Sequence, residues 1–260
     1  MKLHHVPAST GIQWVKLGIR TFFKQPFALA GLFFMFMLLV SLLSVIPLLG
    51  HALALALLPA ATLGLMAATK EAAAGQFPMP TVLASAFQAG KERMRAMLVL
   101  GAIYAAGSFV VMGITALVVG QTPGALAPDS AQTAEQLLRQ PEVVRGLVVS
   151  MVLYLPLGLL FWHAPALVHW HGISPAKSLF FSAMACWTNK SALLFYFLGW
   201  SGVFFAVSLV LVLIAMAVGG PQLLGFVVLP LAMLMSAMFF SSLYFTFRDS
   251  FLTDDGQAPA

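Results

Sequence analysis

The chain has 260 residues, of which 61% are apolar and only 8% are charged. Soluble domains are typically about 45–50% apolar and about 25% charged, so this composition excludes a soluble globular domain, a disordered tail and a nucleic-acid-binding module. The net charge of +5 does not change this conclusion, because the basic residues flank apolar segments instead of forming a patch. The single cysteine, Cys186, excludes an internal disulfide and a cysteine-based zinc site. We therefore expect an integral membrane protein with no nucleic-acid partner and no cofactor.

Six segments of 17 to 27 residues contain no Asp, Glu, Lys or Arg. They cover residues 27–49, 52–68, 97–119, 146–168, 192–218 and 223–246. A helix of about 20 apolar residues crosses the hydrocarbon core of a bilayer, and backbone groups in lipid must be paired within the segment. A transmembrane barrel would instead show alternating polarity along each strand. The sequence therefore predicts an all-α membrane bundle of six transmembrane helices, with the first two joined by a tight hairpin at residues 47–51.

The basic residues are distributed unequally between the two predicted sides of the membrane. If the N-terminus is cytoplasmic, only Arg139 and Arg145 lie outside, and the other eleven Lys and Arg residues lie inside. Cytoplasmic segments of membrane proteins carry the excess of Lys and Arg. This asymmetry predicts a multi-pass protein of the bacterial inner membrane with cytoplasmic N- and C-termini.

The segments between the spans follow a repeated pattern. An amphipathic stretch of 12–16 residues precedes the first, third and fifth spans, and each return span carries a Leu-Pro pair, at residues 58–59, 155–156 and 229–230. We interpret this as a single membrane domain over residues 1–260 with pseudo-repeats at about 9–69, 80–168 and 174–247. Residues 248–260 are then a short polar cytoplasmic tail. The alternative is six ordinary helices in which Pro is tolerated.

The amphipathic stretches predict about three interfacial helices. In the first stretch Ile12, Val15, Ile19 and Phe22 share one face, opposite a basic stripe. Such helices lie in the membrane interface, with the apolar face among the acyl chains and the basic face toward anionic lipid. The predicted lipid-interface residues are Lys16, Arg20, Lys24, Lys91, Arg95, Lys177 and Lys190.

The second span carries a small residue at every fourth position. Small faces let membrane helices approach closely, so this stripe predicts helix packing at the centre of the bundle, whereas the alternative is a substrate path. The predicted packing residues are Ala52, Ala56, Ala60, Gly64 and Ala68.

Three histidines lie within nine residues at the end of the fourth span. His163, His169 and His171 are candidate ligands for a transition metal or haem iron. On a continuous helix, however, His163 and His169 differ by about 120° around the axis, and no carboxylate lies in the span to orient them. We therefore favour an interfacial belt formed by these histidines with Trp162 and Trp170. The alternatives are a metal, pH or substrate role.

The rest of the sequence offers few candidates for chemistry. The outer loop at 120–145 predicts a short helix over residues 131–139, with Glu135 and Arg139 paired at i,i+4. There is no phosphate-binding glycine loop, nucleophile elbow or carboxylate pair. The sequon at Asn189 is predicted on the cytoplasmic side, where it has no role. Ion-coupled pumps place charged residues at bilayer depth, and these spans hold none.

Several segments resemble a known group of proteins. GIQW at 11–14, GIRTF at 18–22, LPAATLGL at 58–65 and WHAPALVHWH at 162–171 resemble an uncharacterised family of inner-membrane proteins from beta-proteobacteria, and the resemblance covers nearly the whole chain. More distantly, the layout is similar to the membrane domain attached to some glycerophosphodiester phosphodiesterases, whose catalytic domain is not present. The resemblance implies a membrane and a class, and carries no functional residues.

Two functions remain open from the sequence. The first is a protein without a catalytic site that organises membrane lipids, predicted to be anionic, or a membrane protein complex through its basic interfacial helices. The second is a permease or channel for a small uncharged or lipid-like molecule, for which we expect a polar cavity lined by Pro59, Thr62, Pro156 and Pro230. A metal- or haem-binding protein that uses the histidines is a more distant third.

Overall fold

The structure is a computed structural model that describes residues 2–47, 49–119, 139–218 and 222–252. In this part of the chain, six helices are long and apolar enough to cross a membrane, which confirms the all-α prediction with six spans. The predicted helix at 131–139, with its Glu135–Arg139 pair, lies outside the described residues. The elements are β1 (Lys2–Leu3), α1 (Thr10–Lys24), α2 (Pro26–Ser44), α3 (Gly50–Ala73), η1 (Pro80–Ala84), α4 (Ser85–Gln88), α5 (Lys91–Val119), α7 (Pro141–Phe161), α8 (Ala164–His171), α9 (Pro175–Thr188), α10 (Lys190–Val218), α11 (Gln222–Ser250) and β2 (Phe251–Leu252).

The ends of the helices differ from the ends of the uncharged segments. α3 continues past Lys70 to Ala73, and α5 already begins at Lys91, because Lys, Glu and Arg are good helix formers. A charge therefore marks the edge of the membrane without ending the helix. α2 is shorter than predicted and ends at Ser44, since Pro47 disfavours a helical backbone at the preceding residue.

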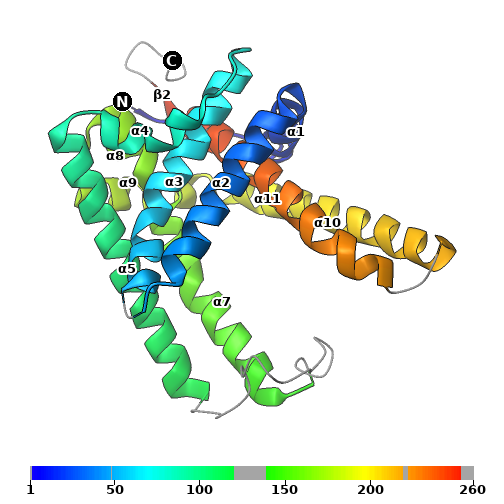
Figure 1. Cartoon of the computed structure of the whole chain (residues 1–260). Coiled ribbons are helices and arrows are strands. Elements are labelled where there is room, and N and C mark those ends of the chain that lie inside the picture. Colours follow the sequence, from blue (N-terminus) through cyan, green and yellow to red (C-terminus); the bar gives the residue numbers. More distant parts are fainter. Residues whose placement is uncertain (1, 48, 120–138, 219–221, 253–260) are drawn as a thin grey trace.

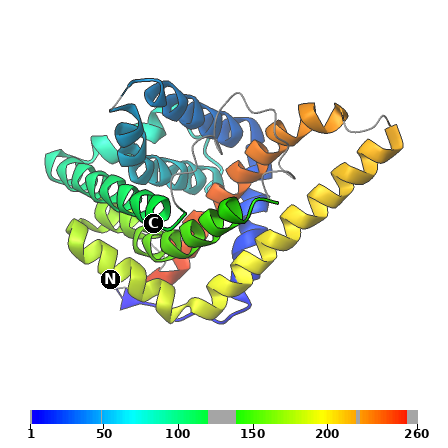
Figure 2. The same ribbon diagram turned by 90° about the horizontal axis from the view of Figure 1, so that it is seen from below.

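Two helical hairpins diverge from a common base, which we define as α1, α8 and α9 with the adjoining parts of α3, α5, α10 and α11 that share one buried core. The α5–α7 pair runs in one direction and the α10–α11 pair in another (Figure 1), and the view from below shows the same separation (Figure 2). Both described ends of the chain lie at the base, where Lys2 pairs with Leu252 in a two-residue antiparallel ladder. Residues 248–252 are therefore not part of a free polar tail: they complete α11 and form β2, and Phe251 is buried because it packs into the core of the base.

The fourth predicted span is broken at Trp162 and His163, between α7 and α8. Pro165 has no N–H and its ring clashes with the carbonyl one turn earlier. Ser182 of α9 fills the gap: its hydroxyl accepts the backbone N–H of His163 at 2.9 Å and donates to the carbonyl of Leu159 at 2.9 Å. A side chain inserted into the helical ladder is a recognised cause of a sharp helix bend.

Helix α1 is packed inside the protein instead of lying against lipid with its apolar face. Val15 and Phe22 are buried, and Trp14 is fully covered. A Cβ on Gly11 would lie 2.0 Å from the Ala192 carbonyl oxygen of α10, and one on Gly18 would lie 2.4 Å from Ser242 Cβ of α11. The prediction that this apolar face lies among acyl chains is therefore wrong. Two glycines let α1 lie directly on α10 and α11.

Helix α3 is the most enclosed of the spans. In its most apolar stretch 56% of residues are buried, against 6% in α10 and 0% in the α7–α8 span. Within the predicted small-residue stripe, Ala60, Gly64 and Ala68 are buried, and Ala52 and Ala56 are half-buried. The stripe meets two neighbours: the Ala56 carbonyl oxygen lies 2.2 Å from where a Cβ on Gly101 of α5 would be, and Gly64 lies against the backbone of Leu83 in η1.

Candidate functional site

The end of α3 turns sharply and brings the next segment back along the helix. Gly75 adopts a left-handed backbone with φ of +83°, which glycine tolerates without steric cost. The N–H of Gln76 donates to the Glu71 carbonyl at 2.9 Å, as at many helix C-termini. The chain then reverses, so that η1 and α4 pack on α3 beside Gly64.

A second left-handed glycine ends α8 near the same place. Gly172 has φ of +63°, and its N–H donates to the Val168 carbonyl at 3.1 Å. His169 and Trp170, in the last turn of α8, lie beside the end of α3. α8 itself is buried along Ala164–Val168, which holds these two side chains in a defined position.

These elements form an open pocket with polar and apolar walls and a volume of about 430 Å³. The ammonium of Lys70 lies 5.6 Å from the centre of the Trp170 ring, within the range of a cation–π interaction. Arg93 and Lys70 are the charged neighbours of His169. We call this the α3–α8 pocket. Its walls are formed by Ala67, Lys70, Glu71, Ala74, Gln76, Val82, Ser85, His169 and Trp170.

Two buried polar atoms at the α3–α8 pocket have unused hydrogen-bonding capacity. Among the residues that the structure describes, neither His169 Nδ1 nor Ser85 Oγ has a hydrogen-bond partner. Buried polar atoms in native proteins are nearly always paired. The pocket is thus lined by one cation, Lys70, and one carboxylate, Glu71, and its wall holds two buried atoms that can each take a further hydrogen bond.

The three candidate histidines do not converge. His163 is fully buried, with its ring centre 5.4 Å from that of Phe251 and 6.0 Å from that of Phe247. His169 lines the α3–α8 pocket, and His171 lies against Phe247. In the part of the chain that the structure describes, no group of three His, Cys, Asp or Glu side chains could hold a metal ion.

Cys186 is also unsuited to chemistry in this environment. Burial raises the pKa of its thiol to about 12, so the thiol is neutral at physiological pH. The thiolate is the nucleophilic form of cysteine. Cys186 Sγ lies 3.7 Å from the Leu159 carbonyl, beside the Ser182 bridge, and its role there is packing.

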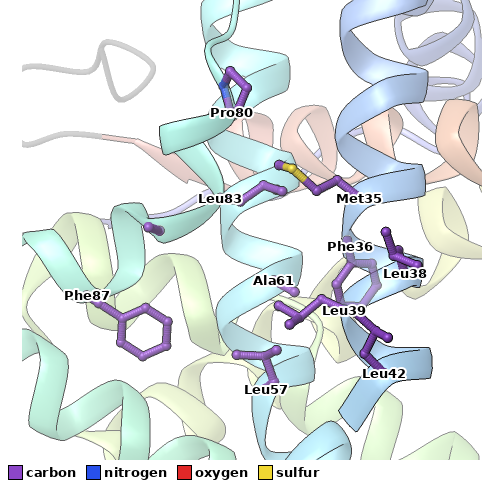
Figure 3. A pocket seen from close by; sticks show the side chains of 11 residues that line it. Met35, Phe36, Leu38, Leu39, Leu42, Leu57, Ala61, Pro80, Leu83 and Phe87 are labelled. Atoms are coloured by element: carbon purple, nitrogen blue, oxygen red, sulfur yellow. The ribbon is translucent and has the colours of Figure 1, made fainter. Parts of the chain in front are cut away.

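An apolar groove runs between α2, α3 and the returning segment. Its volume is about 400 Å³, and Leu39 and Leu42 of α2 face Leu57 of α3 across it (Figure 3). Its described lining is entirely hydrophobic, with Pro80, Leu83 and Phe87 on the third side. The described lining of the groove offers no polar group that could orient or activate a ligand, so the groove suits a hydrocarbon chain.

The predicted lipid-interface residues are all exposed at the base. They belong to α1, to the first turns of α5 and α10, and to the first turn of α9. Lys24 in addition donates to the Ala73 carbonyl at 3.1 Å, which ties α1 to the end of α3. Arg139 and Arg145 are exposed at the opposite end of the α5–α7 hairpin. The structure thus separates the two groups of basic residues.

Asn189 has a structural role that the sequence did not reveal. Its Oδ1 accepts the Val6 N–H at 3.0 Å, and its Nδ2 donates to the His4 carbonyl at 3.0 Å and to Ser250 Oγ at 3.3 Å. This one side chain fastens the N-terminal segment to the end of α11. Sequence reasoning also missed the α3–α8 pocket, although the charged pair Lys70–Glu71 followed by Gly75 marks a turn at the membrane edge.

The chain is similar over its full length to a bacterial membrane protein. It is 34% identical over 269 residues to a probable inner membrane protein of Burkholderia thailandensis, and the alignment covers 100% of this chain and 97% of that protein. No family model and no solved structure matches. No enzyme family is indicated by the match. With six membrane-length helices and this full-length relative, the chain belongs to the same family of multi-pass inner-membrane proteins as the Burkholderia protein.

Proposed function

We propose that this protein organises anionic lipids of the inner membrane from the base of the bundle. One observation carries the proposal: the seven predicted lipid-interface residues are all exposed at the base, whereas Arg139 and Arg145 lie at the opposite end of the α5–α7 hairpin. Cytoplasmic segments hold the excess of Lys and Arg, so we further propose that the base and both termini are cytoplasmic. There the basic residues meet the anionic leaflet.

The packing of α1 supports this role because the protein itself holds the helix in place, whereas a freely inserting helix would be ordered only by the lipid. Lys16, Arg20 and Lys24 are exposed, while the opposite face of α1 is held by α10 and α11. Each basic residue close to an anionic surface contributes about 1 kcal/mol, so this stripe contributes about 3 kcal/mol. Because the helix is already fixed by the protein, lipid binding does not have to order it.

The proposal is tested with the full chain, since α1 depends on its contacts with α10 and α11. Nanodiscs are extracted directly from membranes, and the ratio of phosphatidylglycerol to total lipid is measured by mass spectrometry. We expect enrichment over the bulk membrane, and loss of this enrichment in a K16Q/R20Q/K24Q variant. R139Q/R145Q is the matched control and should keep it. Equal enrichment in both variants would contradict the proposal.

Transport is not supported by a specific observation. Of the residues expected to line a central cavity, Pro59 is buried, whereas Pro156 and Pro230 are exposed. The Thr62 hydroxyl donates to the Leu58 carbonyl of its own helix at 2.9 Å. These side chains do not face a common space, so the permease or channel stays a prediction, as does a membrane protein partner.

A further inference from the structure

We infer that the α3–α8 pocket binds one phospholipid headgroup that carries both a phosphate and a primary amine, such as that of phosphatidylethanolamine. The inference deepens the proposed function by giving the base a discrete lipid site. It depends on that function only in placing the base at the cytoplasmic leaflet. The basic stripe of α1 attracts a charged surface, whereas this pocket selects a headgroup.

The cationic side of the pocket fits a phosphate. Lys70 lies over the Trp170 ring, and Arg93 is a charged neighbour of His169. His169 Nδ1 and Ser85 Oγ are buried at the wall without hydrogen-bond partners among the described residues. A hydroxyl can donate to a phosphate oxygen, and so can an imidazole nitrogen that carries hydrogen. Hydrogen bonds between a charged oxygen and such donors are stronger than neutral ones.

The carboxylate in the pocket determines what else the ligand must carry. Glu71 lines the same space as Lys70, and a carboxylate facing a bound phosphate would be repelled by it. A primary ammonium next to the phosphate removes this conflict, because it donates hydrogen bonds to the carboxylate. A quaternary ammonium has no N–H to donate, and an uncharged glycerol headgroup has no positive charge.

The position of the pocket suits a lipid. Lys70 and Glu71 are the first charged residues after the apolar run of α3, and Lys91 to Arg95 precede that of α5. Charged residues that flank apolar spans lie at headgroup depth. The volume of about 430 Å³ falls within the range of small-molecule sites, about 300–1,000 Å³, and can hold a headgroup but not a whole lipid. The acyl chains would remain in the membrane.

The test is native mass spectrometry of the full-length protein in detergent, with increasing dioctanoyl phosphatidylethanolamine. We expect one adduct at saturation, weaker binding of the phosphatidylcholine and phosphatidylglycerol analogues, and much weaker binding of O-phosphoethanolamine, which has no acyl chains. K70Q should weaken phosphatidylethanolamine binding about tenfold, the effect of losing one charged hydrogen bond. R145Q, at the opposite end of the α5–α7 hairpin, is the control and should bind as the native protein does.

Two milder variants keep the test decisive if K70Q does not fold. S85A removes only a hydroxyl and should weaken binding a few-fold. E71Q should reverse the preference, binding phosphatidylglycerol more tightly than phosphatidylethanolamine, which a purely structural role of Glu71 would not produce. Equal binding of all headgroups, or no change in S85A and E71Q, would overturn the inference.

Three further outcomes show which of the two proposals stands. If O-phosphoethanolamine binds as tightly as the lipid, the assignment to a lipid is overturned. If K70Q weakens phosphatidylethanolamine binding and E71Q reverses the preference, while phosphatidylglycerol enrichment still depends on Lys16, Arg20 and Lys24, both proposals are supported independently. Selective binding in the pocket without any effect of the α1 stripe would overturn the proposed function and leave the headgroup site supported.

Discussion

The base of the bundle and the outer parts of the two hairpins both carry large apolar residues, which are buried at the base and exposed in the hairpins. At the base of α10, Trp200 is 2% exposed, and its indole N–H donates to Ser242 Oγ of α11 at 3.2 Å. Little more than one turn further along the same helix, Phe205 is 71% exposed. Both residues are large and aromatic. The difference teaches that apolarity alone does not decide which part of a membrane helix is covered by protein.

What distinguishes the base is the presence of small and polar residues. Lipid tails are as apolar as leucine, so helices gain nothing from hydrophobic contact alone and associate through close packing and hydrogen bonds. Gly11, Gly18 and Gly101 provide the close approaches at the base. Ser182, Asn189 and Ser242 provide the hydrogen bonds. Gly113, Gly158 and Gly202 in the hairpins meet nothing within 4 Å.

The largest difference in the free energy of unfolding is expected when one leucine in each region is shortened to alanine. Leu100 of α5 is fully buried in the core of the base, whereas Leu213 of α10 is exposed. L100A should lower the free energy of unfolding by about 2–5 kcal/mol because it leaves a cavity. L213A should change it by about 0.5 kcal/mol or less. Thermal unfolding in detergent measures both, and equal losses would remove the distinction between base and hairpins.

A smaller effect is expected from adding one methyl group at a glycine. In G18A the new Cβ would lie 2.4 Å from Ser242 Cβ, and overpacking of this kind costs about 1–3 kcal/mol. G202A is the matched control, since a Cβ there meets nothing within 4 Å and alanine favours a helix by up to about 1 kcal/mol. The two variants should therefore shift the unfolding temperature in opposite directions. A downward shift of equal size in both would contradict the close packing of α1.

Asn189 tests the polar contribution to the base. N189A leaves the Val6 N–H and the His4 carbonyl without the partner that the structure shows, which should cost about 1–3 kcal/mol. It should also increase hydrogen exchange in the first ten residues. S41A removes an exposed hydroxyl that donates to the Met37 carbonyl of its own helix and serves as the control. Unchanged exchange at the N-terminus in N189A would show that other contacts hold this segment.

The smallest expected effect concerns the reactivity of a buried and an exposed thiol on α9, and it involves no change in the free energy of unfolding. Cys186 has a pKa raised to about 12 by burial, so the neutral thiol predominates up to that pH and N-ethylmaleimide should not label it at pH 7–8. In W187C the added thiol sits on the exposed side of α9, and one adduct is expected by mass spectrometry. Rapid labelling of native Cys186 would mean that the α7–α9 contact opens readily.

The candidate site was only partly accessible from the sequence. The charged pair Lys70–Glu71 marks the edge of a span, and Gly75 marks a turn, so a reversal at the membrane surface could be anticipated. That Ser85 and His169 meet there could not be. They lie on separate elements, and the sharp bend at Trp162 and His163 that orients α8 depends on Ser182, a residue of a third helix.

The sequence by itself determined the membrane class, the six spans and the separation of basic residues. These follow from the absence of charge over membrane-length segments, because lipid excludes charged residues whatever the tertiary contacts are. Only the tertiary structure decided which apolar faces are covered. The apolar face of α1 reads as lipid-facing, yet Val15 and Phe22 are buried in protein. Lipid and protein interior are equally apolar, so an amphipathic pattern cannot distinguish them, and the steric fit of Gly11 and Gly18 against α10 and α11 settles the outcome.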